Sequence, residues 1–555
     1  MVKALKVSIV VPVYNAGEYI ELCAPSLTGQ SLGQDEYEII YVDDGSTDDS
    51  LERLERLAAR HPNVRVQTQQ NSGWPGKPRN VGIEMARGEY VQLVDQDDVL
   101  APEALERLYA MASRNGSDIV LGKMAGTMVG PSNIFKRNRE RCTVADAPLI
   151  ETLTAHRLFR RQFLVENDIR FPEGYWRMED LLFMVRAYPL AKTVSVLADY
   201  PCYFWNRRED GGNNSGAAFD LADHYRRLRL IIQALKDSTE PGELQDRLLR
   251  RLYRVETMVR VGEPFITDAE DELRRESYEL SRGVARECFP PGVREGMPAV
   301  QKLRATLLED GEPEGLLELA RRVRQVKAHL DVADIGWRED GALSMKVRFT
   351  LRRPSGAPLA VLEKDGELIL DPDFTDGVPG VRTLPIADVL SYAYGELLVH
   401  DRARNIWWFP EGDLVPRLEA MGDGLSQVVV DGQAVLDPRT LAGGEPLQPG
   451  SYDVWLGAQA LGVGRRPRLN PADAQQRTPM GSTALGDTGR TVSAGWSGPG
   501  KQLRLVVKEP APAPAPPPRP TGARRVYRAA LRLLPKRSRK AVRKLAASVA
   551  RRVRG

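Results

Sequence analysis

The sequence predicts an α/β catalytic domain with a Rossmann-like, mostly parallel sheet, followed by a helical region, β-sandwich modules and a basic tail. Strand and helix patterns alternate through residues 1–125, helical periodicity dominates residues 219–330, and strand-like alternation follows residue 331. With 555 residues the chain is too long for a single core. Alternating strands and helices predict a sheet covered by helices, whose ligands bind at the carboxyl ends of the strands.

The first part of the chain contains five strand-like segments. KVSIVVPVY, the first of them, is an apolar run typical of a strand buried on both faces. Polar residues follow several of these strands directly, as expected of a binding edge. The five predicted strands are residues 6–14, 38–43, 64–69, 88–94 and 118–122.

The spacing of apolar residues changes twice in the second half of the chain. Apolar residues spaced three and four apart predict helices up to about residue 330. Beyond it, LSMKVRFTL alternates strictly, and VLEKDGELIL and QVVVDGQAVL place Asp-Gly between strand-like runs, which predicts two hairpins. The expected domains are residues 1–217 (catalytic), 218–330 (helical), 331–509 (one or two β-sandwich modules), 510–520 (Pro-rich linker) and 521–555 (basic tail).

Charge and cysteine content narrow the class of protein. The four cysteines are far apart and form no CxxC pair, so we expect a reducing, cytoplasmic environment and no disulfide framework. The amino terminus lacks a signal-peptide pattern, and no apolar run reaches the roughly 20 residues of a spanning helix. Residues 521–555 hold 13 Lys and Arg and no Asp or Glu, which points to an anionic partner for the tail.

The stretch VQLVDQDDVL, residues 91–100, places three carboxylates at the end of an apolar strand. Asp95 and Asp97 are two residues apart, so in an extended chain their side chains leave on the same side. Such neighbours repel each other unless a cation lies between them, and oxygen ligands suit Mg²⁺ or Mn²⁺. The alternative for an isolated motif is a solvated acidic turn that precedes the next helix.

Four segments together carry a resemblance to a known family. They are PVYNAGEY, VDDGSTD, NSGWPGKPRNVGIEMARGEY and RLFRRQFLVENDIRFPEGYWRMEDLLFMVRA. In order and spacing they resemble the GT-A nucleotide-binding domain of family 2 glycosyltransferases, over about residues 5–215. The Trp74-Pro75 pair resembles the subset that glycosylates wall teichoic acid, a polyol-phosphate polymer.

The resemblance implies roles on the donor side. Asp44 would accept the uracil N3–H bond, Asp97 would bind the metal directly, and Asp95 would contact the ribose or help to orient the metal. Arg207 or Arg208 would close over the diphosphate from a flexible lid. The other residues expected to hold the nucleotide are Pro12, Val13, Tyr14, Asn71, Arg79 and Asn80.

On the acceptor side, Glu179-Asp180 matches the Glu-Asp pair of the family. Asp180 would be the base that takes the proton of the incoming hydroxyl, and Glu179 would bind acceptor hydroxyls. One base and direct displacement imply inversion at the anomeric carbon. The alternative for a lone pair is a stabilising interaction with the dipole of the helix that it begins.

The expected function is therefore an inverting, metal-dependent glycosyltransferase that uses Mn²⁺ or Mg²⁺. It would move a hexose or N-acetylhexosamine from a UDP-sugar to a cell-surface polymer such as teichoic acid, or to its lipid-linked precursor. One alternative is a non-catalytic carbohydrate-binding scaffold with a relic nucleotide site. The other is a nucleotidyltransferase, which would need a Gly-rich phosphate loop that VPVYNAGEY lacks.

Two further partners are expected from the appended parts. In the tail, one helical face would carry the apolar residues Val542, Leu545, Val549 and Val553. Lysines and arginines would lie on or beside the other face. This pattern predicts an amphipathic helix on anionic lipid. The enzyme would then be peripheral at the inner face of the cell membrane. The alternative is a disordered basic tail that binds nucleic acid or nothing specific. Among the partners we expect no nucleic acid. The β modules resemble oligomerisation or polymer-binding modules, so a homo-oligomer is possible.

Overall fold

The computed structural model describes residues 5–211, 220–470, 480–498 and 502–510. The predicted basic tail, residues 521–555, and the predicted linker beyond residue 510 lie outside the described residues. Residues 1–508 form one compact unit. Among the helices described, none is long and apolar enough to cross a membrane.

The amino-terminal sheet has the strand order β3-β2-β1-β4-β8-β6-β9-β5, with β7 paired to β9. β1, β2, β3 and β4 pair in parallel, as the alternating sequence pattern predicts. The three-residue β8 lies antiparallel between β4 and β6, so the complete sheet is mixed. The strands are β1 (Val7–Val13), β2 (Tyr37–Asp43), β3 (Val64–Thr68), β4 (Tyr90–Leu93), β5 (Val99–Leu100), β6 (Ile119–Ala125), β7 (Arg139–Cys142), β8 (Leu158–Arg160) and β9 (Val194–Phe204).

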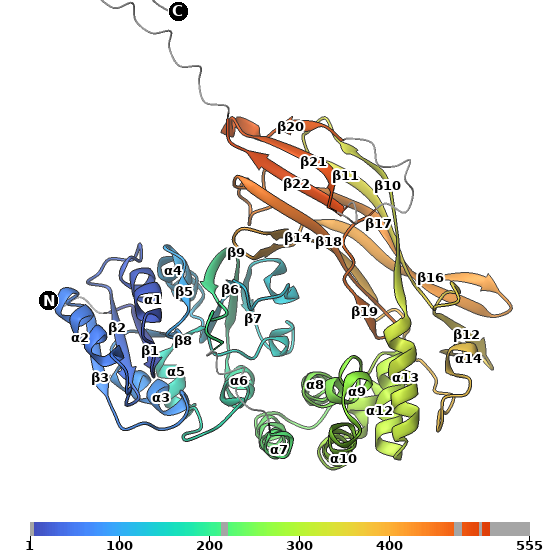
Figure 1. The fold of residues 1–555 in the computed structure, drawn as a ribbon, viewed down its shortest axis with the longest axis horizontal. Coiled ribbons are helices and arrows are strands. Elements are labelled where there is room, and N and C mark those ends of the chain that lie inside the picture. The colour runs from blue at the N-terminus through green and yellow to red at the C-terminus, as the bar shows by residue number, and fades with distance from the viewer. Residues whose placement is uncertain (1–4, 212–219, 471–479, 499–501, 511–555) are drawn as a thin grey trace, which may run out of the picture. The chain divides into compact units, whose positions relative to one another are not determined.

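Helices α1 (Tyr19–Thr28), α2 (Ser50–Arg60), α3 (Gly76–Met85), α4 (Ala104–Asn115) and α6 (Glu179–Leu190) accompany this sheet (Figure 1). All seven residues of β1 are buried, which explains its unbroken apolar sequence. A Cβ on Gly82 would lie 2.2 Å from Val10 Cγ1, so this glycine allows α3 to approach β1 closely. This approach fixes α3, the helix that carries Arg79, against the sheet.

A helical region follows, with its helices packed beside one another (Figure 1). Asp220 caps the first of them, because its carboxylate accepts a hydrogen bond from the Asp223 backbone N–H. The principal helices are α7 (Leu221–Asp237), α8 (Glu243–Leu252), α10 (Asp271–Cys288), α12 (Ala299–Asp310) and α13 (Pro313–Gln325). A π turn, η4 (Tyr253–Thr257), directly continues α8.

Two antiparallel sheets form the described remainder. One has the order β10-β11-β17-β12-β13 with β16 beside β17, and the other β15-β14-β18-β22-β21-β20 with β19 beside β18. Their strands are β10 (Lys327–Trp337), β11 (Leu343–Arg352), β12 (Ala360–Lys364), β13 (Glu367–Leu370), β14 (Tyr394–Asp401), β15 (Ile406–Trp408), β16 (Gly412–Gly422), β17 (Leu425–Leu436), β18 (Gly450–Ala460), β19 (Val463–Arg465), β20 (Ser482–Ala484), β21 (Thr491–Ser497) and β22 (Gln502–Lys508).

One of the two hairpins predicted from Asp-Gly pairs is confirmed and the other is wrong. β12 and β13 pair across Asp365-Gly366. Asp431-Gly432, in contrast, lies inside the continuous strand β17. A Cβ on Gly432 would overlap the backbone of β16, so this glycine serves a close approach of strands. The turn that joins β16 to β17 is Asp423-Gly424, where both residues have positive φ (51° and 74°).

Candidate active site

A cavity of about 940 Å³ lies at the carboxyl ends of the parallel strands. The end of β1, the turn after β2, the start of α3 and the acidic segment after β4 all line it. The first turn of α6 and Arg251 of α8 line it as well. The lining therefore combines residues that the sequence assigned separately to the donor and to the acceptor. Its volume is sufficient for a small-molecule ligand.

The residues predicted to hold the uracil ring surround Asp44, whose side chain is almost fully buried. Pro12, Val13, Tyr14, Asn71 and Asp44 all line the cavity. The Asp44 carboxylate accepts hydrogen bonds from Gln69 Nε2 (2.6 Å) and from the Ser72 backbone N–H and hydroxyl (3.0 and 2.8 Å).

The amide of Asn71 stabilises the loop around this carboxylate. Its Nδ2 donates to the Asp44 carbonyl (2.9 Å), and its Oδ1 accepts from the Gly73 N–H (2.9 Å). Gly73 has a positive φ of 84°, a conformation that glycine adopts without strain. Asn71 therefore shapes the wall of the cavity through the backbone, while Gln69 and Ser72 orient the carboxylate.

Asp95 is held between two cationic groups. Arg79 Nη2 donates to Oδ1 at 2.8 Å, and His156 Nε2 lies 3.0 Å from Oδ2. Burial raises the pKa of Asp95, but the charges of Arg79 and His156 outweigh burial and hold this pKa well below its ordinary value. Burial lowers the pKa of His156, whereas its contact with Asp95 raises it, and the net shift is upward. The contact therefore favours an ionised Asp95 and the protonated form of His156.

The other two carboxylates of the acidic segment have different surroundings. Asp98 accepts from the Tyr203 hydroxyl (2.6 Å) and the Asn206 N–H (3.0 Å), and burial followed by the charge of Asp95 raises its pKa. Asp97 lines the cavity, and burial followed by the charge of Asp95 raises its pKa to about 6. A neighbouring cation would favour the ionised form of Asp97.

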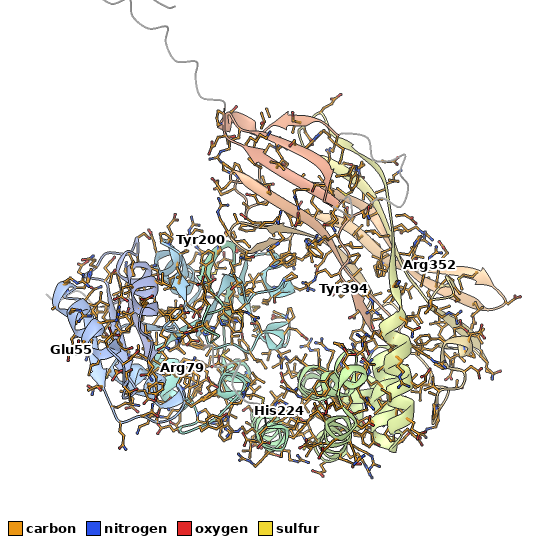
Figure 2. All side chains as sticks on the ribbon, in the orientation of Figure 1. Glu55, Arg79, Tyr200, His224, Arg352 and Tyr394 are labelled. Atoms are coloured by element: carbon orange, nitrogen blue, oxygen red, sulfur yellow. The ribbon has the colours of Figure 1, made fainter. Side chains whose placement is uncertain are left out.

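Arg79, labelled in Figure 2, joins the acidic segment to the first turn of α6. Its Nη1 donates to Asp180 Oδ1 (2.8 Å) and to Glu179 Oε1 (3.0 Å), in addition to the Nη2 contact with Asp95. The Arg79 side chain is only 3% exposed. A planar guanidinium can bridge several carboxylates in this way, and a lysine cannot.

The two carboxylates of α6 are held by further donors. Asp180 Oδ2 accepts from the Ala155 N–H (3.1 Å), and Glu179 Oε2 accepts from Trp74 Nε1 (2.7 Å). Burial and the charge of Asp180 raise the pKa of Glu179 above its ordinary value. Met178 precedes the helix with a φ of 63°, an uncommon left-handed conformation for a non-glycine residue. This turn directs the first helical turn, with both carboxylates, toward the cavity.

The structure brings most, but not all, of the expected residues together. Asn80 is not part of the cavity lining, because its amide forms two hydrogen bonds with the Phe171 backbone (3.0 and 2.9 Å). Arg207 does not line the cavity either, and its backbone N–H donates to the Thr127 hydroxyl (2.7 Å). Arg208 does line it, with its guanidinium 4.1 Å from the centre of the Tyr19 ring.

His156, Trp74 and Ser72 contact the predicted carboxylates, although the sequence did not single out these contacts. His156 lies in a segment without a motif, between η2 (Leu149–Glu151) and β8, so its contact with Asp95 depends on the tertiary fold. In the sequence, Trp74 stood out only as part of the Trp74-Pro75 pair that resembles the teichoic acid subset. Only the fold shows that its indole N–H bonds Glu179.

The acidic segment and His156 together offer ligand atoms of the kind that a divalent cation binds. Among the described residues, Asp95, Asp98 and His156 place ligand atoms within 4.8 Å of one another. Both oxygens of Asp95 and of Asp98 already accept hydrogen bonds from the protein, however. Asp97 also lines the cavity, and its carboxylate would be a ligand of such a cation together with oxygens of the bound nucleotide.

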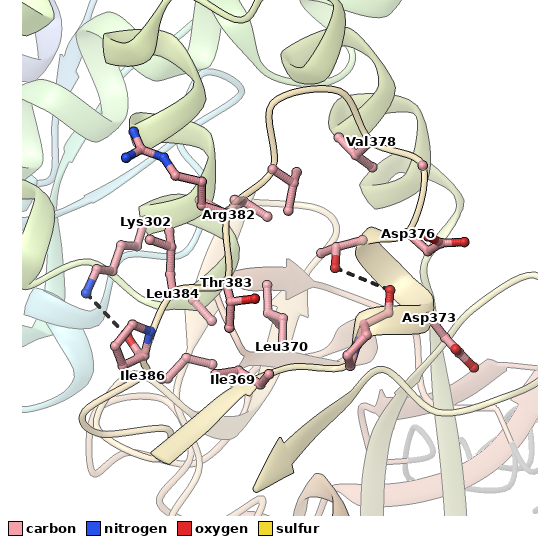
Figure 3. A pocket seen from close by; sticks show the side chains of 17 residues that line it. Lys302, Ile369, Leu370, Asp373, Asp376, Val378, Arg382, Thr383, Leu384 and Ile386 are labelled. Atoms are coloured by element: carbon pink, nitrogen blue, oxygen red, sulfur yellow. Dashed lines mark hydrogen bonds between the residues drawn. The ribbon is translucent and has the colours of Figure 1, made fainter. Parts of the chain in front are cut away.

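A second cavity, of about 530 Å³, lies between α12 and residues 369–386 (Figure 3). Its cationic side chains interact with neighbouring groups. Lys302 Nζ lies 2.7 Å from Glu295 and 3.3 Å from the Pro385 carbonyl, and Arg382 pairs with Asp310. We therefore place the chemistry in the first cavity, whose described lining contains six carboxylates and four arginines.

Comparison with protein families agrees with this placement. The model for glycosyl transferase family 2 matches residues 8–178, and the model for the glycosyl transferase TarS linker domain matches residues 221–320. A poly(ribitol-phosphate) beta-glucosyltransferase of Bacillus spizizenii is 41% identical over 237 residues, 42% of this chain and 37% of the relative. The poly(ribitol-phosphate) beta-N-acetylglucosaminyltransferase TarS of Staphylococcus aureus is 36% identical over 248 residues, 44% of this chain and 43% of the relative. The aligned part thus spans less than half the length of both relatives.

Solved structures show the same architecture. S. aureus TarS 1-349 in complex with UDP-GlcNAc superposes with a TM-score of 0.54 at 26% identity, covering 69% of this chain and all of that one. The longer crystal structure of S. aureus TarS covers 92% of this chain and 86% of its own, with a TM-score of 0.52 at 20% identity. The second match shows that the fold continues through the carboxyl-terminal sheets.

Proposed function

Because this chain carries a glycosyl transferase family 2 domain followed by a TarS-type linker domain, we propose that it transfers a sugar from a UDP-sugar to a hydroxyl of a polyol-phosphate polymer. The two relatives described above act on poly(ribitol-phosphate), and a related structure contains UDP-GlcNAc. The observation that carries the proposal is one cavity lined by Asp44, Asp97 and Asp180. The donor, the cation and the acceptor meet there.

Donor binding rests on the strand ends. Asp44 accepts the imide N–H of uracil, and this contact discriminates against bases that present an acceptor there. The ring and ribose lie against Pro12, Val13 and Tyr14, and Asp95, fixed by Arg79 and His156, faces the ribose. Arg208, which lines the cavity, balances charge on the diphosphate. When bound, a cation such as Mn²⁺ or Mg²⁺ supplies Lewis-acid stabilisation of the departing diphosphate.

Acceptor activation rests on the first turn of α6. Asp180 takes the proton of the attacking hydroxyl, and Glu179 binds a neighbouring acceptor hydroxyl. Arg79 and the Ala155 N–H hold the Asp180 carboxylate in position. A single base and one displacement give inversion, which from an α-linked UDP-sugar yields a β-glycoside. The names of both relatives specify beta-linked transfer, which agrees with this outcome.

The test is a donor and acceptor screen. UDP-glucose and UDP-N-acetylglucosamine are each incubated with purified poly(ribitol phosphate) and Mn²⁺, and UDP release and polymer glycosylation are measured. We expect UDP release to depend on both the polymer and the cation, and NMR of the product to show a β-anomer. Failure of every UDP-sugar to react, or an α-anomeric product, would contradict the proposal.

The appended parts give two further proposals. The first is that residues 521–555 bind an anionic membrane surface and place the enzyme at the inner face of the cell membrane, beside a lipid-linked acceptor. The second is that the chain forms a homo-oligomer through its carboxyl-terminal sheets. The charge of the tail and the antiparallel sheets support these proposals. Liposome flotation with and without residues 521–555, and light scattering of the intact chain, test them. Equal flotation of both chains, or a monomeric mass, would refute the corresponding proposal.

A further inference from the structure

We propose that Arg177 and Arg251 form a subsite that binds a phosphodiester group of the acceptor polymer, an inference that rests on the proposed function. Both side chains line the cavity that contains Asp180. Arg177 belongs to the turn just before α6, whereas Arg251 belongs to α8 in the helical region. The subsite therefore assigns the helical region a direct part in holding the acceptor.

The α8 helix is fastened against the catalytic domain on both sides of Arg251. Arg247, one turn earlier, donates through Nη2 to the carbonyl groups of residues 144–145 (2.8 and 2.6 Å). Arg254, in the π turn, pairs with Glu151 (2.6 Å). These two contacts hold α8 against the catalytic domain. Arg251 lies between them and contributes to the cavity wall instead.

Arg251 retains hydrogen-bonding capacity in this position. Its Nη1 pairs with the carboxylate of Glu256 (2.6 Å), a residue of the π turn η4. Its Nε is buried and has no hydrogen-bond partner among the described residues. A guanidinium has five N–H donors in a planar fork, the geometry that phosphate oxygens accept. The side chain is 11% exposed, so little water competes for these donors.

Arg177 lies near a cluster of ionisable groups formed by Arg260, His224 and Glu256. Arg260 and His224, the latter labelled in Figure 2, are close enough for the charge of Arg177 to affect both. Burial first, and then the charge of Arg177, lower the pKa of Arg260. Burial, Arg260 and Arg177 together lower the pKa of His224. The Glu256 carboxylate offsets part of the positive charge of Arg260 and Arg177, and an anionic ligand beside Arg177 would offset more of it.

An anionic acceptor needs such a subsite because the reaction centre itself is acidic. Asp95, Asp97, Glu179 and Asp180 all line the cavity. A phosphodiester chain that enters beside them is repelled, most strongly where water is excluded. Two arginines on the wall offset this repulsion and fix the position of the chain, so that a polyol hydroxyl reaches Asp180. A neutral glycan acceptor would not require them.

The experiment compares Arg251→Gln and Arg177→Gln with the matched control Arg286→Gln in the full-length chain. Arg286 is exposed on α10 and is not part of the cavity lining, so its replacement removes the same charge from the same region. Three quantities are measured: KM for poly(ribitol phosphate), the affinity for UDP with Mn²⁺, and direct binding of a ribitol-phosphate oligomer to unliganded protein. Thermal melting verifies that each variant is folded.

We expect each cavity variant to raise the polymer KM and to weaken oligomer binding by about tenfold, the scale of one lost charge-assisted hydrogen bond. UDP affinity should stay within about twofold, and the salt dependence of oligomer binding should become shallower. The control should match the wild type. Unchanged oligomer binding would overturn the subsite, and so would a parallel loss of UDP affinity, which would assign the arginines to the donor. Because oligomer binding needs no turnover, it tests the subsite even if the proposed transfer reaction fails.

Discussion

Arg79 Nη1 lies 2.8 Å from Asp180 Oδ1, so the proposed catalytic base is ion-paired with a buried guanidinium. The same guanidinium pairs with Asp95 on the donor side. A single arginine thus connects the strand end proposed to hold the nucleotide with the helix proposed to activate the acceptor. Burial opposes the charge of Arg79, but the charges of Asp95, Asp180 and Glu179 outweigh burial and raise its pKa.

Replacement of Asp180 by Asn should remove the base without removing the donor site. The amide keeps the size of the side chain but cannot accept the proton, so kcat should fall by about 10²–10⁴-fold. UDP affinity, measured by calorimetry, should remain near that of the wild type. Glu166→Gln, an exposed position at the end of α5 (Arg161–Glu166), provides a control that should retain activity. Full activity of Asp180→Asn would show that another group is the base.

Replacement of Arg79 should damage both stability and transfer. Arg79→Met leaves Asp95, Glu179 and Asp180 without their shared cation, and breaking a buried ion pair typically costs about 3–5 kcal/mol. Arg79→Lys restores the charge but cannot span all three carboxylates, so it should recover melting temperature more than kcat. Thermal melting and transfer rates measure the two effects. Equal recovery of both by lysine would show that charge alone matters here.

Trp74→Phe tests the indole donor to Glu179. The substitution keeps an aromatic ring in the cavity wall and removes one N–H, so Glu179 Oε2 loses its 2.7 Å partner. An unsatisfied buried acceptor costs about 1–3 kcal/mol, and we expect the acceptor KM to rise by about tenfold with little change in UDP affinity. Steady-state kinetics with varied polymer measures this. A change confined to UDP affinity would instead place Trp74 on the donor side.

Lys123 predicts a pH dependence of stability. It is buried in β6, its Nζ lies 4.5 Å from the centre of the Trp408 ring, and burial lowers its pKa from 10.5 to about 7. Between these pH values the unfolded chain binds more protons than the folded chain, so the contribution of Lys123 to stability is complete above pH 10.5 and is lost as pH falls through 7.

Lys123→Met should therefore raise the melting temperature most at pH 7 and below, and the gain should shrink as pH approaches 10. Melting of the variant and of the wild type across this range measures the difference. Lys346→Met is the matched control, because this exposed lysine of β11 pairs with Asp334 (2.8 Å) and its pKa is raised rather than lowered, so it should show no gain in melting temperature toward pH 7. A gain that is independent of pH would contradict the assignment of a depressed pKa to Lys123.

Elements and site residues could be predicted from the sequence where a short motif lies beside a helix or strand with a clear apolar pattern. The buried run of β1, the acidic segment after β4 and the Glu-Asp pair of α6 could be recognised because each is a short motif beside a regular element. The Asp365-Gly366 hairpin followed from turn chemistry, but Asp431-Gly432 did not, because strand packing rather than a turn requires that glycine.

Contacts made by tertiary packing could not be read in advance. His156 reaches Asp95 across 61 residues of sequence, and no motif surrounds it. Asn80 resembled a pocket residue but bonds the backbone of Phe171, 91 residues away. Arg251 reaches the cavity from a separate helical region, so its place in the cavity lining could not be predicted without the position of α8. In each case the pairing depends on the fold rather than on spacing along the chain.

The central claim is that a UDP-sugar and a divalent cation bind beside Asp97, with Asp180 across the same cavity. A crystal structure with UDP and Mn²⁺ tests it most directly, because anomalous scattering locates the metal. We expect a manganese peak in contact with Asp97 and the diphosphate, uracil at Asp44, and no manganese in the Asp97→Asn variant. A nucleotide bound elsewhere, or a UDP complex without metal at Asp97, would contradict it.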